Sequence, residues 1–154
     1  MLLILERVSG LFGTKSRQKR IESFEKITLH TSGMRCTVDY EIVMQAGQAE
    51  LSRYSVRYTR ENTERVPERR ALVSEQVILQ LLNDCQILSW DGFHGKHPRG
   101  VKDGTMFSFT AVVNGGRTIR AEGSQKFPKH YRELTQAICD MLATDGNALD
   151  TKLN

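Results

Sequence analysis

Hydrophobic and polar residues alternate along the first half of the chain in the pattern of a small antiparallel sheet. Apolar side chains recur at every second position in residues 27–29, 36–44 and 54–58, which is the period of a strand with one buried face. Ser32 and Gly33, and then Gly47, lie between these segments, and serine and glycine are turn formers. The pattern therefore predicts a three-stranded meander.

Three other segments have the period of an amphipathic helix. The N-terminal segment, which a basic run follows in residues 15–20, carries the apolar stripe Leu2, Leu5, Val8, Leu11 and Phe12. The middle segment carries Val73, Val77, Ile78, Leu81, Leu82 and Cys85. The last begins near Pro128, which suits the first turn of a helix, and carries Tyr131, Leu134, Ile138, Met141 and Leu142.

Residues 107–121 predict a β-hairpin. Apolar positions alternate on both of its strands: Phe107, Phe109, Ala111 and Val113 on the first, Ile119 and Ala121 on the second. Both sets face one core only if Val113 pairs with Arg117, because a shift of one residue would turn one set outward. Residues 114–116 then form a three-residue loop, predicted as a type I turn followed by a left-handed Gly116.

Together these elements predict a single α+β domain. Their order favours an antiparallel sheet of about five strands with helices packed on one face, plus the N-terminal amphipathic helix. Residues 60–70 are dense in charges of both signs and include Pro67, which predicts a solvated connection. The expected organisation is an N-terminal helix and basic segment over 1–26, the α+β domain over 27–144 and a frayed tail over 145–154.

The composition is that of an ordinary globular protein. Of the 154 residues, 39% are hydrophobic and 26% are charged, which allows a sizeable core without disulfides or metals. The net charge of +4 is compatible with an anionic partner. The three cysteines are far apart and form no C-x-x-C pair, which indicates a reducing, cytoplasmic location. No apolar run reaches the roughly 20 residues that a transmembrane helix needs.

Catalytic motifs do not stand out in the sequence. It contains no G-x-S-x-G, G-x-x-x-x-G-K-[ST], H-E-x-x-H or G-x-G-x-x-G, the signatures of common hydrolases, phosphate-binding loops, metalloproteases and dinucleotide-binding folds. Cys85 and Cys139 lie on apolar helix faces, where burial keeps a thiol protonated and inert. A non-catalytic role without a cofactor is therefore favoured.

The segment 90–104 offers one set of possible metal ligands. His94 and His97 have H-x-x-H spacing, with Asp91 and Asp103 on either side, and imidazole and carboxylate groups suit zinc or iron. In a loop this spacing fixes no common face, and the neighbouring cations oppose a dication. Surface histidines are the favoured interpretation, and a metal site is the alternative.

Two clusters of basic residues without an acid among them suggest anion binding. One lies in the 94–102 loop, and the other lies where the last helix begins, at an end whose free N–H groups attract anions. If the hairpin brings both clusters to one end of the sheet, they form a single patch suited to phosphate or carboxylate. The predicted binding residues are Trp90, His94, Lys96, His97, Arg99, Lys102, Lys126 and Lys129.

Residues 88–134 contain an ordered series of glycines and aromatic residues. The series reads W-x-G-F, then D-G-x-x-F, then G-x-x-I-x-A-x-G-S-x-x-F-P-x-x-Y. This stretch resembles an uncharacterised domain found in bacterial proteins, and the resemblance implies a shared fold without an established activity. Its aromatic residues are expected to form one cluster where the hairpin meets the last helix: Trp90, Phe93, Phe107, Phe127 and Tyr131.

These observations favour a non-catalytic binding or protein-interaction domain that recognises an anionic group. Its partner would be a protein or a small anionic ligand. One alternative is a metal-dependent or other enzyme that uses the 91–103 loop, and a second is nucleic-acid binding. The N-terminal helix is expected to pack on the domain or to pair with a second copy in a homodimer.

Overall fold

A computed structural model describes residues 20–34, 36–100 and 104–145. The predicted N-terminal helix, Lys102, Asp103 and the tail lie outside these residues. The strands are β1 (Phe24–Ser32), β2 (Thr37–Gln45), β3 (Gln48–Tyr58), β4 (Thr63–Ser74), β5 (Phe93–Gly95), β6 (Met106–Val113) and β7 (Arg117–Ser124). The helices are α2 (Glu75–Asp84), the short 3₁₀ helix η1 (Ile87–Trp90) and α3 (Tyr131–Asp145).

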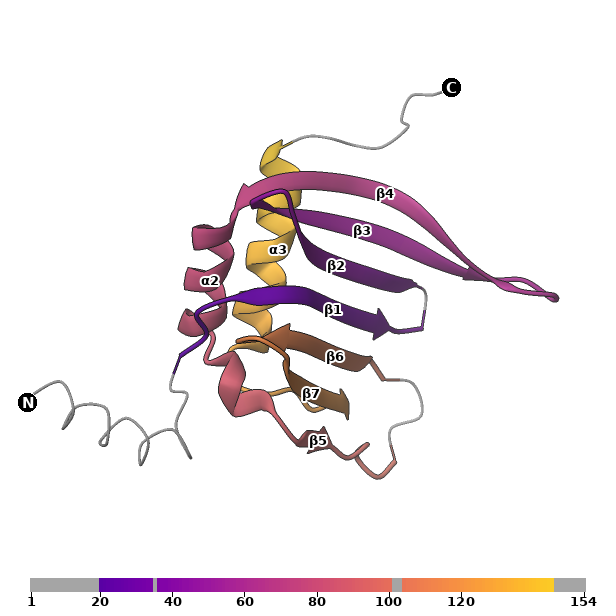
Figure 1. Cartoon of the computed structure of the whole chain (residues 1–154). Helices are drawn as coiled ribbons and strands as arrows, with labels where there is room; N and C mark the ends of the chain where they lie inside the picture. Colours follow the sequence, from indigo (N-terminus) through magenta and orange to yellow (C-terminus); the bar gives the residue numbers. More distant parts are fainter. Residues whose placement is uncertain (1–19, 35, 101–103, 146–154) are drawn as a thin grey trace, which may run out of the picture.

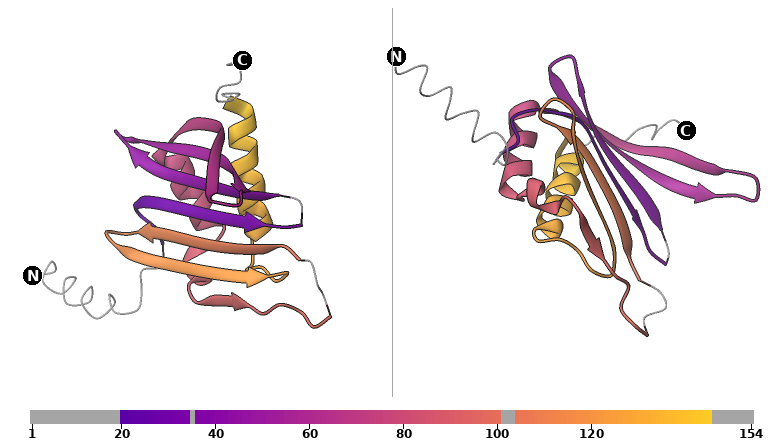
Figure 2. Two further views of the ribbon diagram at one scale, coloured as in Figure 1. Left: turned by 90° about the vertical axis from the view of Figure 1, so that its right-hand side faces the viewer. Right: turned by 60° about the horizontal axis from the view of Figure 1, so that its bottom comes forward.

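The seven strands form one mixed sheet in the order β4-β3-β2-β1-β6-β7-β5. Every neighbouring pair is antiparallel except β5 and β7, which are parallel. Both α-helices pack on the same face of the sheet (Figures 1 and 2). The left view of Figure 2 looks onto the other face, which no described helix covers. None of the described helices is long and apolar enough to cross a membrane.

The core lies between the sheet and the two helices. Alternate strand residues face it, as the row Leu29, Phe109 and Ala121 on β1, β6 and β7 shows. The helices contribute Ile78, Leu79 and Leu82 from α2 and Leu134, Ile138 and Leu142 from α3. Because side chains alternate along a strand, the residues between the core positions point to the uncovered, open face.

The predicted five-stranded antiparallel sheet is wrong, since the described residues form a seven-stranded mixed sheet with two α-helices. One missed strand is β4, which covers most of the charged 60–70 segment and pairs with the whole of β3. It is an edge strand, where charged residues and Pro67 are tolerated because one side of the strand needs no partner. A bulge opposite Arg53 and Tyr54 takes up one extra residue.

The other missed strand is β5, within the segment predicted as a loop. It is only three residues long and pairs in parallel with β7, from Phe93 opposite Ala121 to Gly95 opposite Gly123. Glycine is required at these last two positions. A Cβ atom on Gly95 would lie 2.8 Å, and one on Gly123 2.3 Å, from the carbonyl oxygen of Lys126.

The hairpin has the predicted register, with Val113 opposite Arg117. The turn differs from the prediction, because Asn114, Gly115 and Gly116 all have positive φ. Asparagine tolerates this conformation better than most residues. Its side chain also accepts hydrogen bonds from the backbone N–H groups of Glu22 and Ser23, at 2.7 and 3.3 Å, which hold the turn against the start of β1.

The predicted aromatic cluster is confirmed. Phe107 is its centre, with ring centroids 4.9 Å from Tyr131, 5.4 Å from Phe127 and 6.2 Å from Phe93. The Trp90 ring lies 6.1 Å from Tyr131. Trp90 is 1% exposed, and its indole N–H donates a 3.0 Å hydrogen bond to the carbonyl of Lys129. The cluster therefore joins η1, the hairpin and the start of α3.

We expect Trp90→Ala to lower the free energy of unfolding by about 3–5 kcal/mol, because it leaves a large cavity in the core. Phe127→Ala removes a ring of the same cluster that is 37% exposed, so it should cost less than about 2 kcal/mol. Urea unfolding followed by circular dichroism measures both. Equal costs would contradict the difference in burial between Trp90 and Phe127.

We also expect the free energy of unfolding to fall at high pH, because the side chains of Tyr131 and Cys85 are buried in their protonated forms. Burial raises the pKa of Tyr131 to about 12 and that of the Cys85 thiol to about 11. Stability from these groups is complete below their unfolded pKa values, about 10 and 8.5, and is lost as pH rises toward the folded values. Tyr131→Phe should flatten the fall in melting temperature between about pH 10 and 12, and an unchanged slope would contradict it.

Candidate functional site

One row of polar side chains crosses the open face of the sheet. Asp39, His30, Ser108, Glu122 and His94 lie directly opposite one another on β2, β1, β6, β7 and β5. Residues that are opposite in a sheet point to the same face. The adjacent row, which includes Leu29 and Phe109, is buried on the helix side, so this polar row points away from the core.

Ion pairs occupy the part of the open face formed by β1 to β4. Arg65 lies with its Nε 3.0 Å from Asp39 Oδ2, and its guanidinium stacks 4.0 Å from the centroid of the Tyr54 ring. Further pairs join Lys26 to Glu41 at 3.8 Å and Arg70 to Glu50 at 3.7 Å. Charges of both signs neutralise one another here.

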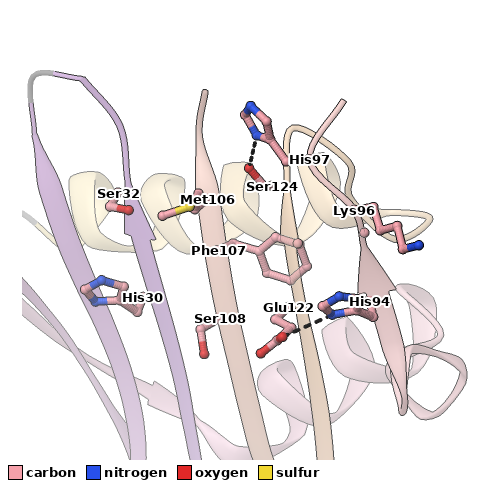
Figure 3. Close-up of a pocket in the computed structure, with 12 residues that line it drawn as sticks. His30, Ser32, His94, Lys96, His97, Met106, Phe107, Ser108, Glu122 and Ser124 are labelled. Atoms are coloured by element: carbon pink, nitrogen blue, oxygen red, sulfur yellow. Dashed lines mark hydrogen bonds and ion pairs between the residues drawn. The ribbon is translucent and has the colours of Figure 1, made fainter. Parts of the chain in front are cut away.

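A groove occupies the part of the open face between β1 and β5 (Figure 3). Its central cavity has a volume of about 430 Å³, within the range of small-molecule sites. The residues that line it are His30, Ser32, His94, Gly95, Lys96, His97, Met106, Phe107, Ser108, Glu122, Gly123 and Ser124. Two smaller cavities of about 220 and 270 Å³ share residues with it and extend it along β6 and β7.

Two histidines of the groove are held by carboxylates through Nδ1. His30 Nδ1 contacts Asp39 Oδ1, and His94 Nδ1 lies 3.0 Å from Glu122 Oε2. Because an ionised carboxylate only accepts hydrogen bonds, each Nδ1 must donate. Neither ring has a second protein partner within the described residues. The Nε2 atom of each ring is therefore available to a ligand. It accepts a hydrogen bond in the neutral ring and donates one in the imidazolium form.

Lys96 adds a positive charge to the wall formed by the residues after β5. No ion pair engages it within the part of the chain described. Glu122 is the acidic residue among those lining the central cavity, and it is paired with His94. His97 is oriented by a hydrogen bond between its Nδ1 and Ser124 Oγ. This end of the groove therefore has positive character.

The structure divides the predicted binding residues between two faces and the core. His94, Lys96 and His97 line the groove, whereas Arg99 is exposed outside its lining. Trp90 is buried and supports the site from below. Lys126 and Lys129 are exposed and do not line the groove.

The backbone of Lys126 lies across the helix-covered side of the sheet, as its contact with Gly123 shows. A Cβ atom on Gly123 would point to that side, where it would also meet Phe107 at 2.8 Å. The segment after β7 therefore passes beneath β7 and β5, while His94 and Lys96 lie above them. The two basic clusters come to one end of the sheet without forming one patch.

Sequence reasoning missed the groove residues that come from other strands. These are His30 and Ser32 on β1, Met106 and Ser108 on β6, and Glu122 and Ser124 on β7. Their alternation with core residues was a signal that they face away from the core. Nothing local indicates that β1 lies beside β6, and this pairing places His30 opposite Ser108.

The described residues that were suggested as metal ligands each interact with a different partner. Asp91 Oδ1 accepts a 3.1 Å hydrogen bond from the backbone N–H of Arg120, while His94 pairs with Glu122 and His97 with Ser124. Among residues 20–34, 36–100 and 104–145, no three histidine, cysteine or acidic side chains are placed to share a metal ion. Asp103 lies outside these residues.

Asp39, His30 and Ser108 follow one another across the sheet in the order of a hydrolase triad. Catalysis by such a triad needs a hydrogen bond between the imidazole and the nucleophilic hydroxyl. His30 is bonded toward β2, through Asp39, and has no hydrogen bond to Ser108 among the described contacts. Among the described contacts, the row therefore consists of two separate carboxylate–histidine pairs, Asp39–His30 and Glu122–His94, with Ser108 between them.

No protein-family model matches the chain, and neither a curated protein nor a solved structure shows a significant similarity to it. The resemblance seen in residues 88–134 therefore contributes no function.

The carboxylate contacts predict an unusual tautomer. We expect neutral His94 to carry its proton on Nδ1, and Glu122→Leu to return it to the Nε2-protonated form that free imidazole prefers. His30, held by Asp39, should keep its Nδ1 proton in this variant and serves as the internal control. Long-range ¹⁵N–¹H correlation spectra distinguish the forms. An Nε2 proton on wild-type His94 would contradict the assignment.

Proposed function

We propose that this chain is a non-catalytic binding domain that holds a small molecule with an anionic group on the open face of its sheet. The observation that carries the proposal is the convergence of His30, His94, Lys96 and His97 on one cavity of about 430 Å³. These residues come from two distant stretches of the sequence, and the sheet brings them to one surface.

The anionic group is expected at the wall that contains His94 and Lys96. Lys96 supplies a positive charge, and His94 presents its Nε2 atom beside it. The Ser108 hydroxyl can donate a hydrogen bond to the same ligand. Hydrogen bonds between charged groups and a ligand are stronger than those between neutral groups.

The groove is wider than a single inorganic anion. Three inter-strand spacings separate His30 from His94, which amounts to about 14 Å. A ligand that contacts both walls is therefore an organic molecule, with its charged group at one wall and a hydrogen-bonding group at the other.

Benzoate and phenyl phosphate are suitable probes, with phenol as the neutral comparison. We expect titration with the anions to shift backbone amide signals of residues 94–97, 106–108 and 122–124, and phenol to bind more weakly. Lys96→Gln should weaken anion binding about three- to tenfold, because it removes the charge and keeps a polar side chain of similar length.

Lys129→Gln is the matched control, since it removes the same charge outside the groove. Equal loss in both variants would show that the anions respond to overall charge and would overturn the proposal. The absence of any shift with millimolar anion would overturn it as well.

A further inference from the structure

The groove continues beyond its central cavity to an end where two methionine side chains are exposed. The adjoining cavity of about 220 Å³ is lined by Met34 and Met106 together with Ser32, Gly33, His97, Gly104 and Ser124. Met106 lines the central cavity too. In Figure 3 its side chain lies between Ser32 on β1 and Ser124 on β7, at the end of the groove away from Ser108.

Both methionines expose at least half of their surface. Met34 is 72% exposed and Met106 is 51% exposed. Methionine is flexible and polarisable, and it is common on surfaces that bind apolar groups of varied shape. Two such side chains at the end of one groove form a surface that gains stability when an apolar group covers it.

The opposite end of the groove differs in chemistry. The cavity of about 270 Å³ there is lined by Arg120, Thr110, Ser108 and Glu122, among others. Its open-face side chains are charged or hydroxyl-bearing. The two ends of the groove therefore differ, because exposed methionines lie beside His97 and two serines at the Met34 end, and no methionine lines the other end.

We propose that the natural ligand is an amphiphile whose carboxylate or other anionic head lies at His94 and Lys96 and whose apolar chain lies over Met106 and Met34. This inference rests on the proposed function and names the class of ligand for the same site. Charge complementarity places the head, and the exposed methionines place the chain. The ligand is a single small molecule, bound without chemical change.

A series of straight-chain carboxylates tests the inference: acetate, butanoate, hexanoate and octanoate. We expect affinity, measured by calorimetry and by amide shifts, to rise about two- to fourfold for each added methylene that reaches the methionines. Octanamide, which keeps the chain and removes the charge, should bind several-fold more weakly than octanoate.

Met106→Gln and Met34→Gln should reduce the dependence on chain length, because glutamine keeps an unbranched side chain and makes its end polar. Leu72→Gln is the matched control, since Leu72 is 53% exposed on β4, away from the groove. Acetate affinity should remain the same in all three variants. A melting curve for each variant separates loss of binding from loss of folding.

The outcomes separate this inference from the proposed function. Binding of every carboxylate with equal affinity would overturn the amphiphile and leave the anion site in place. Binding that rises with chain length but is unaffected by both methionine variants would place the chain elsewhere and overturn the inference. The absence of binding by all members, including benzoate, would overturn both.

Discussion

The indole of Trp90 is the contact on which the rest of the site depends. It is buried between β6 and the start of α3, and its N–H donates to the carbonyl of Lys129. This bond ties the end of η1 to the segment that leads into α3. Because β5 begins three residues after Trp90, the same anchor positions β5 along β7 and thereby builds the outer wall of the groove.

The glycines Gly95 and Gly123 complete this arrangement. Without side chains on the helix side, they allow the backbone of Lys126 to pass directly beneath the β5–β7 pair. The Lys126 backbone and the groove consequently lie on opposite faces of the same β5–β7 pair. A side chain on Gly95 or Gly123 would point to the helix side of the sheet, away from the ligand. It would clash with the backbone of Lys126 and so displace β5, which forms the outer wall of the groove.

The two halves of the open face differ in whether their charged side chains have partners of opposite charge. Between β1 and β4, arginines and lysines meet carboxylates within the sheet itself, and little attraction remains for a ligand. Between β1 and β5, Asp39 and Glu122 orient His30 and His94, and Lys96 has no acid partner among the described residues. This contrast is the reason for placing an anionic ligand in the groove and for leaving the other half as a structural surface.

The sequence by itself determined which residues share a face in β1, β2 and the β6–β7 hairpin, the register of that hairpin from Val113 opposite Arg117, and the aromatic cluster around Phe107. These features follow from side-chain alternation and from the pairing of neighbouring segments, which are local properties. It also placed His94, Lys96 and His97 among the candidate binding residues. The edge strand β4 was missed because its segment is charged and contains Pro67, and β5 was missed because it is only three residues long. Only the tertiary structure decided that β1 lies between β2 and β6, that β5 is parallel to β7, and that Lys126 lies beneath the sheet. Those pairings join residues far apart in the chain, and they depend on how the whole core packs, which no local pattern encodes.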